Sequence, residues 1–155
     1  MTKPEKLAFK TELKLFCKSI IEDRINTAKA AIESAQQSAN NEEKSSAGDK
    51  YETGRAMSHL DKDMHSRQLA ENMKELAVLH SINTSLVYST AEAGAVIHCA
   101  DISFFIATGL GKRSVHNQTI FFLSVSAPLS QLLKNKKAGD SFIFNGTTVI
   151  ISELY

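Results

Sequence analysis

The feature that most constrains this chain is a long segment, from Pro4 to Asn40, that contains no glycine and no further proline. Proline suits the first turn of a helix, where its missing N–H has no partner to lose. Apolar and small residues recur there at the three- or four-residue spacing of one helix face. The segment therefore predicts one long helix. Its expected packing face is made of Leu13, Phe16, Ile20, Thr27, Ala31 and Ser34 or Ala35.

The helical pattern stops at a polar stretch, SANNEEKSSAGDKYETG, which is rich in turn-forming asparagine, serine and glycine. It then resumes and ends near Ile82. Two long helices joined by a short polar break are expected to pack antiparallel. Residues 1–83 are thus predicted to form an antiparallel coiled-coil hairpin with its tip near residues 41–53. The second packing face is expected at Met57, Leu60, Met64, Leu69, Met73, Leu76 and Leu79.

After residue 83 the sequence changes to short apolar stretches separated by glycines, a pattern typical of β-strands. Asn145-Gly146 predicts a hairpin turn, because this pair suits the two positive-φ positions of a type I′ turn. The expected strands cover residues 95–100, 104–107, 119–125, 141–144 and 147–154.

One short helix is expected among these strands. We predict Ser126 as its N-cap and Pro128 within its first turn. Residues 84–155 are thus predicted to form a small β-rich domain with one short helix. The fold class that follows for the whole chain is α+β.

Charge is balanced, with 18 Lys and Arg against 17 Asp and Glu, so there is no overall basic field to attract nucleic acid. No run approaches the roughly 20 apolar residues that a membrane-spanning helix needs. The first residues also lack the apolar core of a secretory signal. We therefore expect a cytoplasmic, monomeric protein with no membrane partner. In it, Cys17 and Cys99 are expected to be reduced thiols.

Two segments resemble one family. The stretch SAPLSQLLKNKKAGD, residues 126–140, resembles the "SPIA-ALLGK-VGD" signature of the Gre transcript-cleavage factors of bacterial RNA polymerase. FIFNGTTVIISEL resembles the closing hairpin of that family, and residues 92–100 are a looser match to its opening strand. The resemblance implies a helical hairpin followed by an FKBP-like β domain, with bacterial RNA polymerase as the partner.

The predicted tip carries Gly48-Asp49-Lys50-Tyr51-Glu52, which resembles the "GDL-EN" tip of the same family. The resemblance implies that Asp49 and Glu52 help to hold a Mg²⁺ ion jointly with the polymerase. Cleavage of a backtracked transcript would then be the polymerase's own reaction, so this chain is not expected to be an enzyme. It would meet the 3′ end of the nascent RNA only indirectly.

Other interpretations of these acids remain open. Carboxylates near a helix N-terminus are also favoured by the helix dipole, without any function. Lys50, Tyr51 and Thr53 depart from the family pattern. Glu42 and Glu43 form a second acidic pair just before the tip and are the runner-up for the same role.

The partner-binding residues implied by the resemblance lie around the short helix. They are Ser126, Pro128, Lys134, Lys136 and Lys137. A structural explanation competes for the lysines, because cations near a helix C-terminus are stabilised by the dipole.

Three alternative functions are kept. The closest is a regulator or inhibitor that enters the secondary channel of the polymerase without stimulating cleavage. The others belong to different classes: an FKBP-like isomerase or chaperone, and a structural coiled-coil protein.

Overall fold

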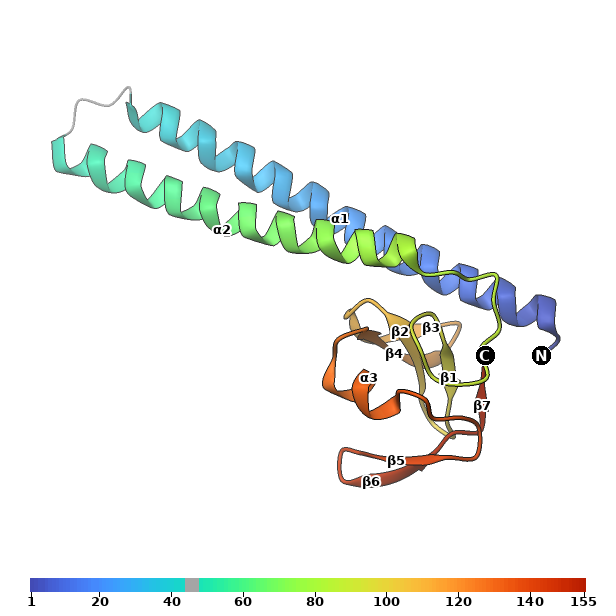
Figure 1. The fold of residues 1–155 in the computed structure, drawn as a ribbon. Helices are drawn as coiled ribbons and strands as arrows, with labels where there is room; N and C mark the ends of the chain where they lie inside the picture. Colours follow the sequence, from blue (N-terminus) through green and yellow to red (C-terminus); the bar gives the residue numbers. More distant parts are fainter. Residues whose placement is uncertain (44–47) are drawn as a thin grey trace. The chain divides into compact units, whose positions relative to one another are not determined.

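The computed structural model describes the backbone of residues 1–43 and 48–155, and the side chains of residues 1–41 and 53–155. Two long helices, α1 (Lys3–Glu43) and α2 (Gly48–Ser81), come first. A β-rich part with one short helix, α3 (Pro128–Leu133), follows them (Figure 1). The predicted α+β class, a helical hairpin and then a β-rich domain, is confirmed.

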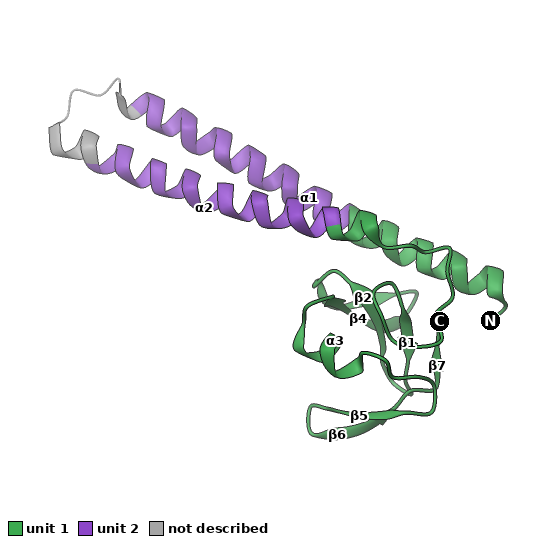
Figure 2. Ribbon diagram, in the orientation of Figure 1, with its two compact units in different colours: residues 1–18, 78–155 green, residues 19–77 purple. Residues whose placement is uncertain are grey.

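The chain divides into two compact units (Figure 2). The first contains residues 1–18 and 78–155, and the second contains residues 19–77. The division falls within both helices, because the start of α1 and the end of α2 pack with the strands. The domain boundary between residues 83 and 84 stays a prediction.

The start of α1 has a reciprocal cap that joins Thr2 and Glu5. The Thr2 N–H donates to Glu5 Oε2 over 2.8 Å, and the Glu5 N–H donates to Thr2 Oγ1 over 3.3 Å. This arrangement satisfies two N–H groups that a helix start leaves without partners. Pro4 lies in the first turn, as predicted.

The packing face of α1 matches the predicted one at Leu13 and partly at the half-buried Phe16, but its other fully buried positions differ. The buried positions follow a four-residue step, whereas Ile20 is half-buried and Thr27 is exposed. Since a helix has 3.6 residues per turn, a repeated four-residue step winds slowly around the helix instead of keeping to one line. The buried series is Phe9, Leu13, Cys17, Ile21, Ile25 and Ala28.

The predicted packing face of α2 is wrong over most of its length. Met57, Leu60, Met64 and Met73 are exposed, while the ammonium of Lys62 donates to Gln36 Oε1 of α1 over 2.8 Å. Over residues 26–39, α1 carries mainly small and polar residues, so it offers α2 little large apolar surface to pack against. Only towards its end does α2 bury large residues, at Leu79 and then at Ile82 beyond its last turn.

The β-rich part contains a five-stranded sheet in the order β3-β4-β2-β1-β7 and a separate β5–β6 hairpin (Figure 1). β2 and β4 pair in parallel, and the other neighbours are antiparallel. The strands are β1 (Val96–His98), β2 (Ser103–Ala107), β3 (Gly111–Val115), β4 (Gln118–Ser124), β5 (Ser141–Phe144), β6 (Thr147–Ile150) and β7 (Glu153–Leu154).

Two features of this part differ from the sequence prediction. Strand β3 was not predicted, because it is an edge strand that buries only Val115 and has no apolar stretch. The single strand expected over residues 147–154 is two strands, since β6 pairs with β5 and β7 pairs with β1. The predicted hairpin turn is confirmed, with φ of 51° at Asn145 and 77° at Gly146.

Phenylalanine side chains make much of the core of the β-rich part. Phe104 of β2 is fully buried and lies 5.7 Å from the ring of Phe142 and 5.4 Å from that of Phe144, in edge-on contacts. The ring of Phe16 stacks on that of Phe122 at 5.4 Å, so the start of α1 packs against β4. The first unit therefore holds a large aromatic core, whereas the sequence of residues 19–77 contains no phenylalanine.

Candidate functional site

The predicted tip acids have a defined place along the backbone. α2 begins at Gly48, so Asp49 and Glu52 are its second and fifth residues, and Glu42 and Glu43 end α1. The side chains of all four lie outside the described residues, so their role at a metal stays a prediction. Among the residues with described side chains, no group of three or more His, Cys, Asp or Glu could hold a metal ion.

The segment before α3 is organised differently from the prediction. Ala127, not Ser126, is the N-cap, with no side-chain hydrogen bond, and Pro128 is the first helical residue. The Ser126 N–H instead donates to Ser124 Oγ over 3.2 Å. Ser130 donates its hydroxyl to the carbonyl of Ser124 over 2.6 Å. Ser124, the last residue of β4, thus accepts hydrogen bonds from both serines.

The end of α3 is joined to the loop before β1 through the main chain. The Lys134 N–H donates to the Ser130 carbonyl over 3.0 Å, and Asn135 adopts a positive φ of 66° that ends the helix. Asn135 then donates its N–H to the carbonyl of Ala91 over 3.1 Å, and Ala91 donates to the carbonyl of Lys136 over 2.7 Å. These main-chain bonds fix the positions of Lys134 and Lys136.

The next lysine closes the turn into β5. The Lys137 N–H donates to Asp140 Oδ2 over 2.9 Å, and the Asp140 N–H donates to the Lys137 carbonyl over 3.0 Å. The side chains of Lys134 and Lys137 are exposed, whereas Lys136 is half-buried. The three lysines thus lie on one short stretch after α3, and their role in binding a partner stays a prediction.

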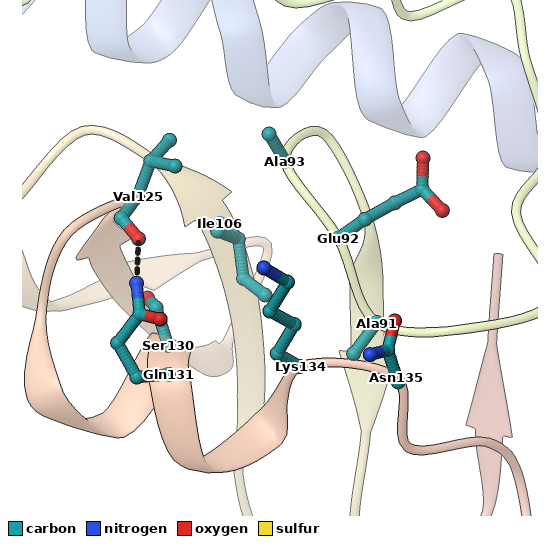
Figure 3. A pocket seen from close by; sticks show the side chains of 9 residues that line it. All are labelled: Ala91, Glu92, Ala93, Ile106, Val125, Ser130, Gln131, Lys134 and Asn135. Carbon is teal, nitrogen blue, oxygen red and sulfur yellow. Dashed lines mark hydrogen bonds between the residues drawn. The ribbon is translucent and has the colours of Figure 1, made fainter.

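A small pocket of about 130 Å³ lies between α3, β2 and the loop before β1 (Figure 3). Lys134 extends from the end of α3 towards Ile106, and Gln131 donates its amide to the carbonyl of Val125 over 3.3 Å at one side. Its lining combines apolar side chains with the carboxylate of Glu92 and the ammonium of Lys134. It is lined by Ala91, Glu92, Ala93, Ile106, Val125, Ser130, Gln131, Lys134 and Asn135.

Of these lining residues, the sequence predicted only Lys134 as a site residue. The others come from three segments whose spatial proximity depends on the parallel pairing of β2 with β4. The local pattern at Ala91, Ile106 and Val125 carries no signal that could have identified them.

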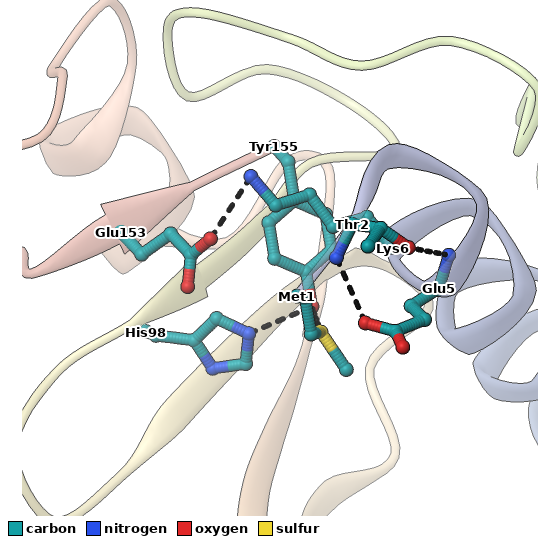
Figure 4. Close-up of polar contacts among 7 residues, drawn as sticks. All are labelled: Met1, Thr2, Glu5, Lys6, His98, Glu153 and Tyr155. Atoms are coloured by element: carbon teal, nitrogen blue, oxygen red, sulfur yellow. Dashed lines mark hydrogen bonds and ion pairs between the residues drawn. The ribbon is translucent and has the colours of Figure 1, made fainter.

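A polar cluster ties the start of α1 to β1 and β7 (Figure 4). His98 pairs through Nδ1 with the hydroxyl of Ser103 at 2.7 Å and through Nε2 with that of Tyr155 at 2.8 Å. Lys6 forms an ion pair with Glu153 at 2.9 Å. Burial lowers the pKa of His98 and raises that of Tyr155, which favours their neutral forms. These contacts explain the cluster as structural, because they hold the start of α1 to β1 and β7.

Two lysines of α1 hold the segment that follows α2. Lys10 is fully buried, donates to the carbonyl of Leu86 over 2.7 Å and lies 4.3 Å from the centre of the Tyr88 ring. Lys14 donates to the carbonyl of Ile82 over 2.7 Å. No local sequence pattern predicts these two bonds, because each acceptor lies on the segment that follows α2.

Both cysteines are free, buried and in the first unit. Burial raises the pKa of each thiol to about 11, so the reactive thiolate is disfavoured. Within the ranges that the structure describes, no helix is long and apolar enough to cross a membrane.

Fold and site together define an α+β protein with a helical hairpin and a β-rich part that carries a small pocket. No family model and no curated protein match the chain. Among solved structures it is similar to one described as "Structure of the transcription factor Gfh1", with a TM-score of 0.36 and 12% identity. The match covers 89% of this chain and 92% of that one. At this score the likeness carries no argument about function.

Proposed function

We propose that this chain is a Gre-like factor that binds bacterial RNA polymerase and presents Asp49 and Glu52 from the hairpin tip. The observation that carries the proposal is the position of the Gly48-Asp49-Lys50-Tyr51-Glu52 motif at the start of the returning helix α2. It is supported by the order of the elements, in which a β-rich part with α3 opened by Pro128 follows the hairpin. The polymerase is the enzyme in this proposal.

The chemistry of the two carboxylates suits a shared magnesium site. Mg²⁺ prefers oxygen ligands, keeps several waters and takes only one or two carboxylates from a protein. Asp49 and Glu52 would complete a site whose other ligands belong to the polymerase. When bound there, Mg²⁺ would supply the positive charge that assists hydrolysis of the transcript. Glu42 and Glu43 are the second choice for the same role.

Docking on the polymerase is assigned to the surface around α3. The exposed ammonium groups of Lys134 and Lys137 and the apolar pocket beside them suit a surface with acidic and aliphatic side chains. Ser126 and Pro128 lie on the same short stretch and belong to this candidate surface.

A cleavage assay on backtracked complexes tests the proposal. Purified bacterial RNA polymerase is stalled in a backtracked state, and the protein is added with Mg²⁺. We expect faster transcript cleavage, lost in Asp49→Asn and in Glu52→Gln while binding persists. Removal of one such ligand is expected to slow cleavage by about a hundredfold or more. The matched controls are Glu42→Gln and Glu43→Gln, and a loss confined to these controls would transfer the role to the runner-up pair.

A non-cleaving regulator of the same channel is the second candidate. It is favoured by Lys50, Tyr51 and Thr53, which depart from the family tip. Binding without faster cleavage in the same assay would establish it against the leading proposal, whereas absence of binding would overturn both. An FKBP-like isomerase is less well supported, because no aromatic side chain lines the pocket.

A further inference from the structure

The second unit has an apolar face that the hairpin itself does not cover. Met57, Leu60 and Met64 of α2 are exposed by 62%, 67% and 45%. Their spacing of three and four residues places them on one side of the helix, so they form a continuous stripe. We call these three residues the outer stripe. Along the described part of α1 in this unit there is no exposed large hydrophobic side chain.

The outer stripe is not part of the contact between the two helices. That contact includes the polar pair in which the Lys62 ammonium donates to Gln36 Oε1. A helix normally buries its long apolar side chains and leaves lysine at the surface. Over two turns of α2 this arrangement is reversed, because the apolar side chains are exposed and the lysine contacts α1. The reversal indicates that the outer stripe packs against a surface other than α1.

Acidic residues flank the outer stripe on both sides. With Met57 and Met64 as a positions and Leu60 as a d position of a heptad, Asp61 and Asp63 occupy the e and g positions, and both are exposed. In helix pairs these flanking positions select the partner through charge. The chemistry that fits is an amphipathic helix with an apolar face and lysine or arginine at its flanks.

A second copy of this chain fits less well. In an antiparallel pair centred on the outer stripe, Asp61 and Asp63 would face their own counterparts, and like charges at such positions are unfavourable. Three partly exposed side chains also cover only a few hundred Å², well below the roughly 1,000 Å² that a stable interface needs. The outer stripe therefore suits a partner that is already held by other contacts.

The position of the outer stripe along α2, close to the tip, indicates which protein supplies the partner helix. Met57 follows Glu52 by five residues, which is about 7.5 Å along the helix. A tip that enters a channel of the partner brings the outer stripe against the wall of that channel. We propose that the outer stripe packs against a basic-flanked amphipathic helix of the bacterial RNA polymerase that receives the tip. This inference rests on the proposed function and adds a contact surface to it.

Binding of variants to purified bacterial RNA polymerase tests the inference. The triple variant Met57→Ser, Leu60→Ser, Met64→Ser removes the apolar surface, and we expect its Kd to rise about tenfold or more. Met73→Ser, on the same helix and 54% exposed but outside the outer stripe, is the matched control and should stay within about twofold. Because all four positions are exposed, circular dichroism should show unchanged helix content.

The charged flanks are tested separately. Asp61→Lys with Asp63→Lys should weaken binding by about tenfold, whereas Asp23→Lys, a matched reversal at an exposed position of α1, should not. A photoreactive residue at position 60 should crosslink to a polymerase helix bearing lysine or arginine, and one at position 73 should not.

The outcomes separate the two proposals. Normal binding by the triple variant would overturn the outer-stripe inference and leave the proposed function intact. No binding by the unaltered protein would overturn the proposed function and the named partner with it. A dimer of the unaltered protein in sedimentation, lost in the triple variant, would assign the outer stripe to a second copy and overturn the inference.

Discussion

At the scale of single residues, the least expected feature is the buried ammonium of Lys10. Its ammonium donates a hydrogen bond to the Leu86 carbonyl and lies over the face of the Tyr88 ring. Burial lowers its pKa from 10.5 to about 8, although Glu92 partly opposes this effect. Lys10 thus holds the segment after α2 while it carries a desolvation cost.

This cost predicts a pH dependence of stability. Between pH 8 and 10.5 the unfolded chain binds more protons at residue 10 than the folded chain, so the free energy of unfolding rises with pH in that window. Relative to Lys10→Met, the unaltered protein should therefore gain stability from pH 8 to pH 10. Urea denaturation at several pH values measures this difference in the free energy of unfolding. Lys29→Met, at an exposed position, is the control. A constant difference across the window would contradict the lowered pKa.

At the scale of elements, α1 and α2 show that periodicity finds a helix more reliably than its buried face. Leu13 is fully buried, whereas Leu15, two residues later on the same helix, is 59% exposed. The predicted packing face included Leu13 and left out Leu15, so periodicity separated this pair, but it missed Ile21, which is also buried.

The two leucines give a matched stability test. Leu13→Ala should lower the free energy of unfolding by about 2–5 kcal/mol, since it leaves a cavity in the first unit. Leu15→Ala should change it by no more than about 0.5 kcal/mol. Urea denaturation monitored by circular dichroism measures both. Similar losses for the two variants would show that the buried face of α1 has been assigned to the wrong side.

At the scale of the whole molecule, the two units differ in how they are held together. The first contains the phenylalanine core around Phe104, whereas among the described residues of the second the large buried side chains are Ile21 and Ile25. A unit with few large buried side chains opens at lower free energy than one with a full core.

Hydrogen exchange should report this difference. We expect amides of residues 56–77 of α2 to exchange at least tenfold faster than those of β2 and β4, measured on peptides by mass spectrometry. The amides near Leu79 serve as an internal comparison, because they belong to the same helix but to the first unit. Equal protection along all of α2 would contradict the contrast between the units.

Much of this architecture could be predicted from the sequence, because absence of glycine and proline, a polar break and the Asn145-Gly146 turn are local signals. Strand β3 could not, since an edge strand needs no apolar stretch. The N-cap predicted at Ser126 was wrong because α3 begins at Pro128, so the cap position falls on Ala127, while the Ser126 hydroxyl pairs with that of Ser124 at 3.0 Å.

The candidate site was predictable to a smaller extent. Lys134, Lys136 and Lys137 lie together because they are neighbours in the sequence. The pocket beside them was beyond prediction, since Ala91 and Ile106 reach it only through pairing of distant strands. Whether Asp49 and Glu52 share a metal depends on a partner, which no local pattern encodes.

The main-chain bonds between Ala91, Asn135 and Lys136 have a consequence for how such a pocket can diversify. They join the backbone of the loop before β1 to that of the segment after α3, so this part of the frame does not depend on which side chains line the pocket. Substitutions at Lys134, Gln131 or Val125 therefore change what the pocket prefers without rebuilding its frame. In a scaffold of this kind, the backbone frame can stay the same while the lining side chains change. The ligand that the pocket prefers then changes with those side chains.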